Sequence, residues 1–95
     1  MLYRELLDEL KTSKGWTLDD RGRIRNVNGC CPVCYVANRK LKKRKYGLNV
    51  GDANDYLKLD NRVLSRLVVV VDNVTHDESY SSRTRRDLLN ACNLR

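Results

Sequence analysis

Three of the four cysteines lie close together, at Cys30, Cys31 and Cys34. Cys31 and Cys34 have the C-x-x-C spacing that serves both metal ligation and thiol chemistry. Pro32 suits the first position of a helix, and a helix N-terminus lowers the pKa of a nearby thiol, so Cys31 would be the more reactive of the pair. Metal ligation, thiol reactivity and plain packing are the three hypotheses for this segment.

A structural zinc ion on Cys31 and Cys34 would need two further ligands. Cys30, His76 and Cys92 are the candidates. The sequence has no second C-x-x-C or C-x-x-H pair, and its single histidine lies in a probable loop, where it is more typical of a surface cap residue. Structural zinc therefore stands beside the simpler interpretation of buried packing thiols, and no other cofactor is expected.

The segment 31–41 resembles the active-site helix of glutaredoxins. In that family the motif follows a buried strand, and a cis-proline faces the dithiol. The preceding segment, Asn26-Val27-Asn28-Gly29, is not such a strand, and Pro32 is the only proline of the chain. A thioredoxin-type fold is therefore not predicted.

Positive charge is concentrated between Arg21 and Gly51, a segment with nine Lys or Arg residues and no Asp or Glu. The remaining residues carry ten basic and twelve acidic side chains, so this segment accounts for the whole net charge of +7. Such a block repels itself unless an anion lies opposite, which indicates a nucleic acid or an acidic protein surface as partner. A solvated face that promotes solubility is the simpler alternative.

Lysine and arginine neutralise phosphates without reading bases, so nucleic-acid binding would be salt-sensitive and weakly specific. Tyr46 and Tyr35 are near enough to stack on unpaired bases. The candidate contact residues are Arg23, Arg25, Arg39, Lys40, Lys42, Lys43, Arg44, Lys45 and Tyr46. Arg83, Arg85 and Arg86 of the last helix would form a second strip of contact residues if the fold places them on the same side as the basic helix.

Enzymatic chemistry has little support in the sequence. The glycines of Gly47-Leu48-Asn49-Val50-Gly51 are not followed by the Lys-Ser/Thr of a phosphate-binding loop. Asp72, Asp77 and Ser79 lie near His76 in the sequence, but proximity along the chain alone does not predict a catalytic site. We therefore expect a protein without enzymatic activity.

The 95 residues predict a single domain, residues 1–95, with one modest core. Alternating residues around Asp19-Asp20-Arg21-Gly22 predict a β-hairpin at residues 16–25. The four valines of Val68–Val71 suit a strand by propensity, but the helical spacing that precedes them favours a helix. Helices are predicted over residues 2–13, from Pro32 through the basic block, from a cap at Asp52 to 57 or 58, from a cap at Asp60 past Val71, and from about 82 to 92. The predicted fold is mainly α, with about four to five helices and one short hairpin.

The longest apolar run, Leu67–Val71, is far shorter than the ~20 residues of a membrane span. The first residues form an amphipathic, partly acidic helix, unlike a signal peptide. We expect a cytoplasmic protein without membrane contact, whose cysteines are thiols or metal ligands and not disulfides. The oligomeric state does not follow from the sequence.

Several short motifs are spread over residues 16–94. Trp16-Thr17-Leu18 precedes Gly22-Arg23-Ile24-Arg25, and Gly29-Cys30-Cys31-Pro32-Val33 opens the next helix. Val70-Val71-Asp72 and the segment 86–94, Arg-Asp-Leu-Leu-Asn-Ala-Cys-Asn-Leu, complete the pattern. The pattern is similar to small uncharacterised accessory proteins of tailed bacteriophages. This resemblance implies a phage accessory protein in the host cytoplasm and brings no catalytic residues.

Three functions are consistent with these observations. The favoured one is a small basic, non-enzymatic protein that contacts nucleic acid through its hairpin and basic helix. The alternative is a protein–protein inhibitor or adaptor that docks the same cations on an acidic surface of a host defence or transcription protein, with tyrosines and exposed leucines as anchors. The third is a small domain stabilised by structural zinc.

Overall fold

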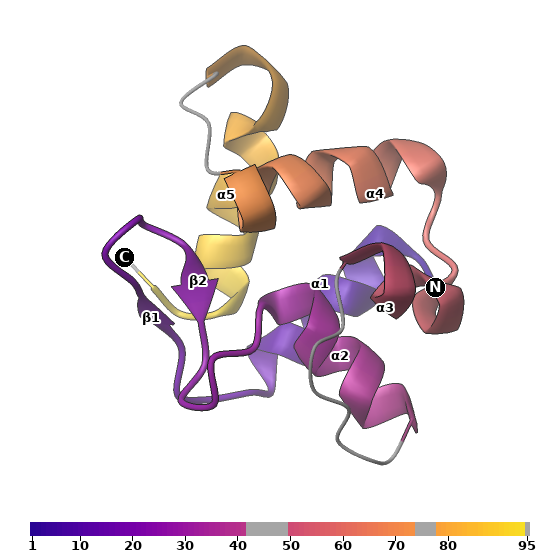
Figure 1. The fold of residues 1–95 in the computed structure, drawn as a ribbon, viewed down its shortest axis with the longest axis horizontal. Coiled ribbons are helices and arrows are strands. Elements are labelled where there is room, and N and C mark those ends of the chain that lie inside the picture. Colours follow the sequence, from indigo (N-terminus) through magenta and orange to yellow (C-terminus); the bar gives the residue numbers. More distant parts are fainter. Residues whose placement is uncertain (42–49, 74–77, 95) are drawn as a thin grey trace.

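A computed structural model describes residues 1–41, 50–73 and 78–94 of the chain. These residues form five α-helices, one π-helical turn and a two-stranded antiparallel hairpin. Helices α1, α2 and α3 pack near the N-terminus, α4 and α5 cross beside them, and the hairpin lies at one side (Figure 1). The prediction of a mainly α protein with a short hairpin is confirmed.

Helix α1 spans Tyr3–Lys11, slightly less than the predicted range of 2–13. Its Leu6 and Leu10 are completely buried in the core. The helix ends early because the hydroxyls of Thr12 and Ser13 donate to backbone carbonyls of its last turn.

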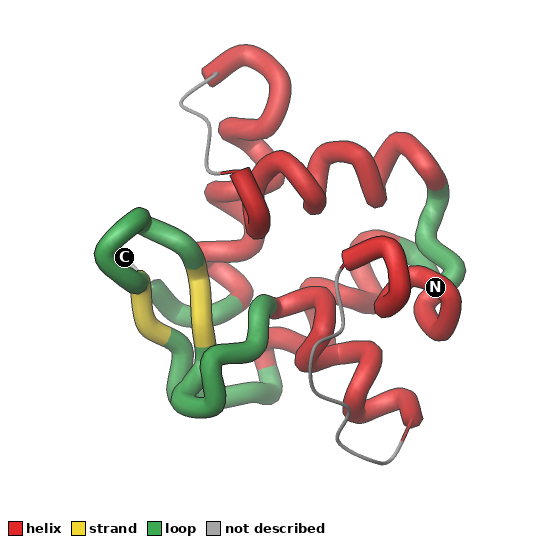
Figure 2. Tube along the Cα trace, in the orientation of Figure 1, coloured by secondary structure: helices red, strands yellow, loops and turns green. Residues whose placement is uncertain are grey.

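The hairpin pairs β1 (Thr17–Leu18) with β2 (Ile24–Arg25) where it was predicted. The Asp19 side chain closes the turn by accepting two backbone N–H groups, at 2.9 and 2.8 Å. Gly22 has a φ of +77°, a conformation that other residues rarely adopt. Because side chains alternate along a strand, Ile24 enters the core while Arg25 points to the opposite face. Figure 2 shows the two strands within loop segments at one side of the helices.

Helix α2 spans Pro32–Leu41 and starts at the predicted proline. Val33, Val36 and Ala37 form its buried stripe. The predicted continuation of this helix through the basic block lies outside the described residues.

Helix α3 spans Val50–Leu57, so the prediction that Asp52 caps it is wrong. Val50 and Ala53 are both buried, and this burial extends the helix in the N-terminal direction. Asp52 instead lies in the first turn, where a carboxylate favours the helix dipole. The Asn54 side chain closes the following loop by accepting the Leu59 N–H at 2.8 Å.

Helix α4 spans Asn61–Val68, and its predicted cap is confirmed because Asp60 accepts the Arg62 N–H at 2.8 Å. The chain continues as a π-helix, η1, over Val69–Asn73. The valine run is therefore helical and not a strand. Val70 and Val71 are buried, so the apolar helical spacing decides the conformation of this run against the strand propensity of valine.

Helix α5 spans Glu78–Ala91, so the predicted start near residue 82 is wrong. Residues 78–81 carry almost no apolar periodicity, and the pattern that predicts this helix begins only later. Leu88 is completely buried, and the Tyr3 hydroxyl of α1 donates to Asp87 at 2.9 Å. These contacts fix α5 against α1. No helix in the described ranges has both the length and the apolar character needed to cross a membrane.

Candidate functional site

The predicted contact residues that the structure describes have different surroundings. Arg23 and Arg25 belong to the hairpin, whereas Arg39 and Lys40 belong to the last turns of α2. Outside the described residues lie Lys42, Lys43, Arg44, Lys45 and Tyr46. The two groups of described cations are therefore considered separately.

Arg39 connects α2 to the end of α1. Its Nη1 lies 3.3 Å from Oε2 of Glu9 and donates to Oγ1 of Thr12 at 3.1 Å. The guanidinium also lies 5.8 Å from the centre of the Tyr35 ring. A carboxylate and an aromatic face thus compensate the charge of Arg39. The neighbouring Lys40 is exposed.

Arg23 is part of the hairpin turn. Its Nε donates to Oδ2 of Asp19 at 2.7 Å, beside the backbone bonds that Asp19 accepts. The Arg23 N–H, together with the Arg23 side chain, lowers the pKa of Asp19. The aspartate therefore stays ionised, and it neutralises the nearest arginine.

Arg25 has no such carboxylate partner among the described residues. Its Nη2 donates to the Val71 carbonyl of η1 at 3.4 Å, and its Nη1 donates to the Ile24 carbonyl at 3.2 Å. Carbonyl oxygens satisfy N–H donors but carry no net charge. Arg25 is half-buried and keeps its positive charge uncompensated by these contacts.

Arg85 of α5 faces the hairpin turn. A Cβ placed on Gly22 would lie 3.6 Å from Nη2 of Arg85, so the absence of a side chain at Gly22 leaves room for the guanidinium. The Nη1 of Arg85 is buried and has no hydrogen-bond partner in the described part of the chain. Buried polar groups are normally paired, which makes this donor an exception.

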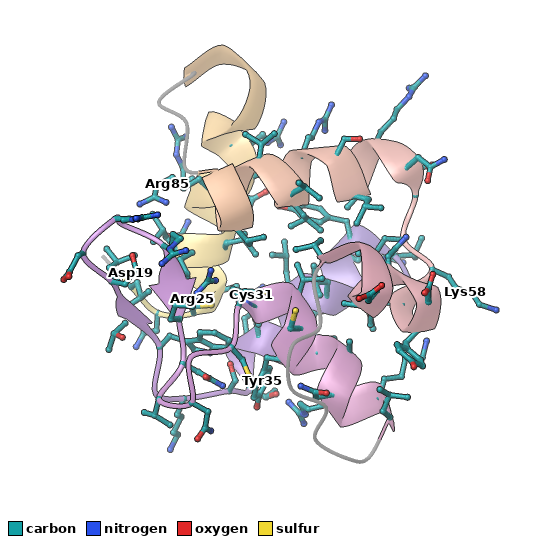
Figure 3. All side chains as sticks on the ribbon, in the orientation of Figure 1. Asp19, Arg25, Cys31, Tyr35, Lys58 and Arg85 are labelled. Carbon is teal, nitrogen blue, oxygen red and sulfur yellow. The ribbon has the colours of Figure 1, made fainter. Side chains whose placement is uncertain are left out.

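We use the term hairpin–α5 junction for Arg25, Arg85, Gly22 and the Val71 carbonyl. Figure 3 shows Arg25 and Arg85 on the side of the molecule where the hairpin meets α5. Neither arginine forms an ion pair with a carboxylate of a described residue. Two further arginines of the same helix, both exposed, are Arg83 and Arg86. The junction can therefore attract an anion.

Charge counting alone does not single out Arg85 among the three arginines of α5. Its position three residues before the completely buried Leu88 is the available signal, because residues at that spacing share a helix face. The sequence could not indicate that the hairpin would meet this face.

The cysteine pair lies where β2 leads into α2. The backbone N–H of Cys34 donates to Sγ of Cys31 at 3.3 Å. Several groups lower the pKa of Cys31 to about 7. They are the hydrogen bond from the Cys34 side chain, the backbone N–H of Cys34, the nearby charge of Arg25 and the backbone N–H of Val33. Burial acts in the opposite direction but is outweighed. The Cys31 thiolate is therefore well populated at neutral pH.

The other cysteines differ from this pair. Burial raises the pKa of Cys92 to about 12, so its thiol is inert at neutral pH. None of the four cysteines forms a disulfide. The described residues contain no group of three or more His, Cys, Asp or Glu side chains placed to hold a metal ion, and His76 lies outside the described ranges. The zinc hypothesis stays a prediction.

Comparisons with protein-family models, with curated proteins and with solved structures found no match for this chain.

Proposed function

We propose that this protein binds nucleic acid without catalysing a reaction, and that the hairpin–α5 junction contacts phosphate groups. One observation carries the proposal: the fold holds Arg25 and Arg85 at a shared junction without a carboxylate partner among the described residues. Leaving the Nη1 of Arg85 buried and unpaired costs about 1–3 kcal/mol. Arg85 as a residue is only half-buried, so a rotation of its guanidinium would bring this donor to a bound phosphate oxygen, and a charge-assisted hydrogen bond would remove that cost.

Further cations would extend the contact along a nucleic-acid backbone. Arg83 and Arg86 are exposed beside Arg85, and Lys40 is exposed near the start of the basic block. Contacts of this kind fix a protein on the phosphates and carry no base information. The expected binding is thus salt-dependent and tolerant of sequence.

The resemblance to phage accessory proteins supports placing this activity in the cytoplasm of an infected bacterium. There, a basic protein would meet both DNA and RNA. The rival function, docking on an acidic host protein, would use the same charges, so the two are separated by experiment.

The test is fluorescence anisotropy of the purified protein with short single- and double-stranded DNA and RNA, from low to near-physiological salt. We expect binding whose affinity falls steeply with salt. In the Arg25→Gln/Arg85→Gln double variant the slope of log K against log salt should become shallower by about one for each lost phosphate contact.

The matched control is the Lys58→Gln/Arg62→Gln variant, which removes the same charge from exposed positions. Lys58 lies on the side of the molecule away from the hairpin in Figure 3. Equal weakening in both double variants would mean that net charge alone drives binding. No binding of any nucleic acid at low salt would contradict the proposal and favour an acidic protein partner.

A further inference from the structure

Cys31 and Cys34 lie together at the beginning of α2, where the backbone N–H of Cys34 donates to the Cys31 sulfur. Cys31 directly precedes the helix, and Cys34 lies in its first turn. The Cys31 sulfur accepts the Cys34 N–H at 3.3 Å, which is the role of the oxygen in an ordinary N-cap residue. The C-x-x-C spacing places the two side chains on the same side of this first helical turn, within reach of each other.

The surroundings of Cys31 stabilise a thiolate through several donors. The N–H groups of Val33 and Cys34 point towards it, and the positive charge of Arg25 lies near. Figure 3 shows Cys31 at the start of α2, beside the strand that carries Arg25. The nucleophilic form of a cysteine is the thiolate, and Cys34 is placed to react with whatever forms on Cys31.

Access to this pair is narrow. Cys31 and Cys34 are each only 7% exposed, whereas Cys30 is half-buried. With so little exposed surface, these thiols are more accessible to a small oxidant such as hydrogen peroxide than to a bulky disulfide. Disulfides that form in reducing compartments are usually transient and serve catalysis or redox sensing.

We propose that Cys31 and Cys34 form a peroxide-reactive dithiol that closes to an intramolecular disulfide. The Cys31 thiolate attacks one oxygen of hydrogen peroxide, an S–O bond forms as the O–O bond breaks, and hydroxide leaves and is protonated by solvent. The Cys34 sulfur then attacks the Cys31 sulfenic acid. The S–S bond forms as the S–O bond breaks, and the departing oxygen takes the Cys34 proton to leave as water. Two thiols lose two electrons in total, and one peroxide is reduced to two waters.

The experiment uses the full chain with Cys30→Ser, treated with a chelator and then with stoichiometric hydrogen peroxide. Tryptic cleavage gives the peptide 26–39, in which Cys31 and Cys34 are then the remaining cysteines, and the peptide 87–95, which contains Cys92. We expect the first peptide to lose about 2 Da, the mass of two hydrogens, while the second stays unmodified. Adding Cys34→Ser should stop the reaction at a sulfenic acid on Cys31 that dimedone traps.

The proposal is overturned if peptide 26–39 keeps its mass, if Cys31→Ser reacts as fast as the parent, or if Cys92 is oxidised equally. A second measurement uses the same Cys30→Ser chain. The rate at which peptide 26–39 loses about 2 Da should rise about tenfold between about pH 6 and pH 8, as the Cys31 thiolate forms, and then level off. A rate that continues to rise several-fold towards about pH 9 is the behaviour of an ordinary thiol and contradicts the proposal.

Discussion

Arg39 and Arg85 are the same residue type in two different electrostatic settings. Arg39 lies between α1 and α2, 3.3 Å from a Glu9 carboxylate oxygen and near the face of Tyr35. Arg85 lies at the hairpin–α5 junction, where its buried Nη1 has no partner among the described residues. The first arginine joins two helices through an ion pair, and the second carries a charge that no carboxylate of a described residue pairs with.

The difference shows why a count of basic residues is a poor map of a binding surface. Arg39 belongs to the most basic segment of the sequence, yet its guanidinium is paired with the Glu9 carboxylate. Arg85 lies outside that segment, and its charge is not compensated by a described carboxylate. The available positive charge in the described part of the molecule is therefore found at the junction as much as in the basic helix.

The largest expected effect is a loss of binding in Arg85→Gln. Hydrogen bonds to charged groups contribute about 1.5–3 kcal/mol, so affinity for nucleic acid at low salt should fall about tenfold or more. Arg39→Gln should change it by less than about twofold, because that charge is already paired. Anisotropy titrations of both variants against one oligonucleotide measure the contrast.

Stability should move in the opposite direction to binding at Arg85. Removing a buried unpaired donor relieves a cost, so the free energy of unfolding of Arg85→Gln should stay equal or rise. If urea denaturation shows a marked loss of stability in Arg85→Gln, Arg85 has a structural role like that of Arg39. The two arginines would then not differ in the way described above.

The pH dependence of stability tests the electrostatics beside Arg25. The pKa of Cys31 is about 7 in the folded chain and near 9 for an ordinary thiol. Its contribution to stability is therefore fully present above pH 9 and is lost as pH falls through about 7. The free energy of unfolding should rise from pH 7 to pH 9, less so in Arg25→Gln, and least in Cys31→Ser. The same value at both pH values in the parent protein would show that the Cys31 thiolate is not favoured by the fold.

Gly22→Ala tests the turn beneath Arg85 and should cost about 1 kcal/mol, because Gly22 has a φ of +77°. Gly29→Ala is its matched control, with a φ of +79° and no heavy atom within 4 Å of the added Cβ. Thermal unfolding should show similar losses for both. A much larger loss at Gly22 would mean that Arg85 cannot accommodate the methyl group at 3.6 Å.

A modest loss of stability is expected in Arg39→Gln. Partly exposed ion pairs contribute about 0.2–1 kcal/mol, and an exposed cation–π contact adds about 0.5–1 kcal/mol. Urea denaturation should therefore show a decrease of about 1 kcal/mol. Glu9→Gln, which frees the charge of Arg39 instead, should strengthen nucleic-acid binding slightly. Unchanged stability in Arg39→Gln would indicate that the contact with Glu9 is incidental.

The sequence predicted most elements because their signals are local. Leucines at helical spacing mark α1, Pro32 starts α2, and Asp60 caps α4 as expected. The failures have local causes as well: burial of Val50 moves the start of α3, and the absence of periodicity before residue 82 hides the start of α5. The valine run is ambiguous by propensity, and its tertiary surroundings place it in a helix.

The candidate site was predictable only in part, because it depends on contacts between distant segments. The sequence indicated the C-x-x-C pair and its reactive member, since their spacing and helix start are local. It could not indicate that Arg39 would meet Glu9, thirty residues earlier, or that Arg85 would meet the hairpin turn at Gly22. Whether an arginine is free or neutralised is a property of the packed chain.

The most direct test of the central claim is NMR observation of arginine side-chain N–H groups during titration with a short oligonucleotide. We predict that the Arg25 and Arg85 signals shift with a common affinity and become protected from exchange, while the Arg39 signal stays close to its position in the free protein. Shifts of the Arg39 signal with no change of the Arg25 and Arg85 signals would contradict binding at the hairpin–α5 junction. They would indicate that the basic helix is the binding surface.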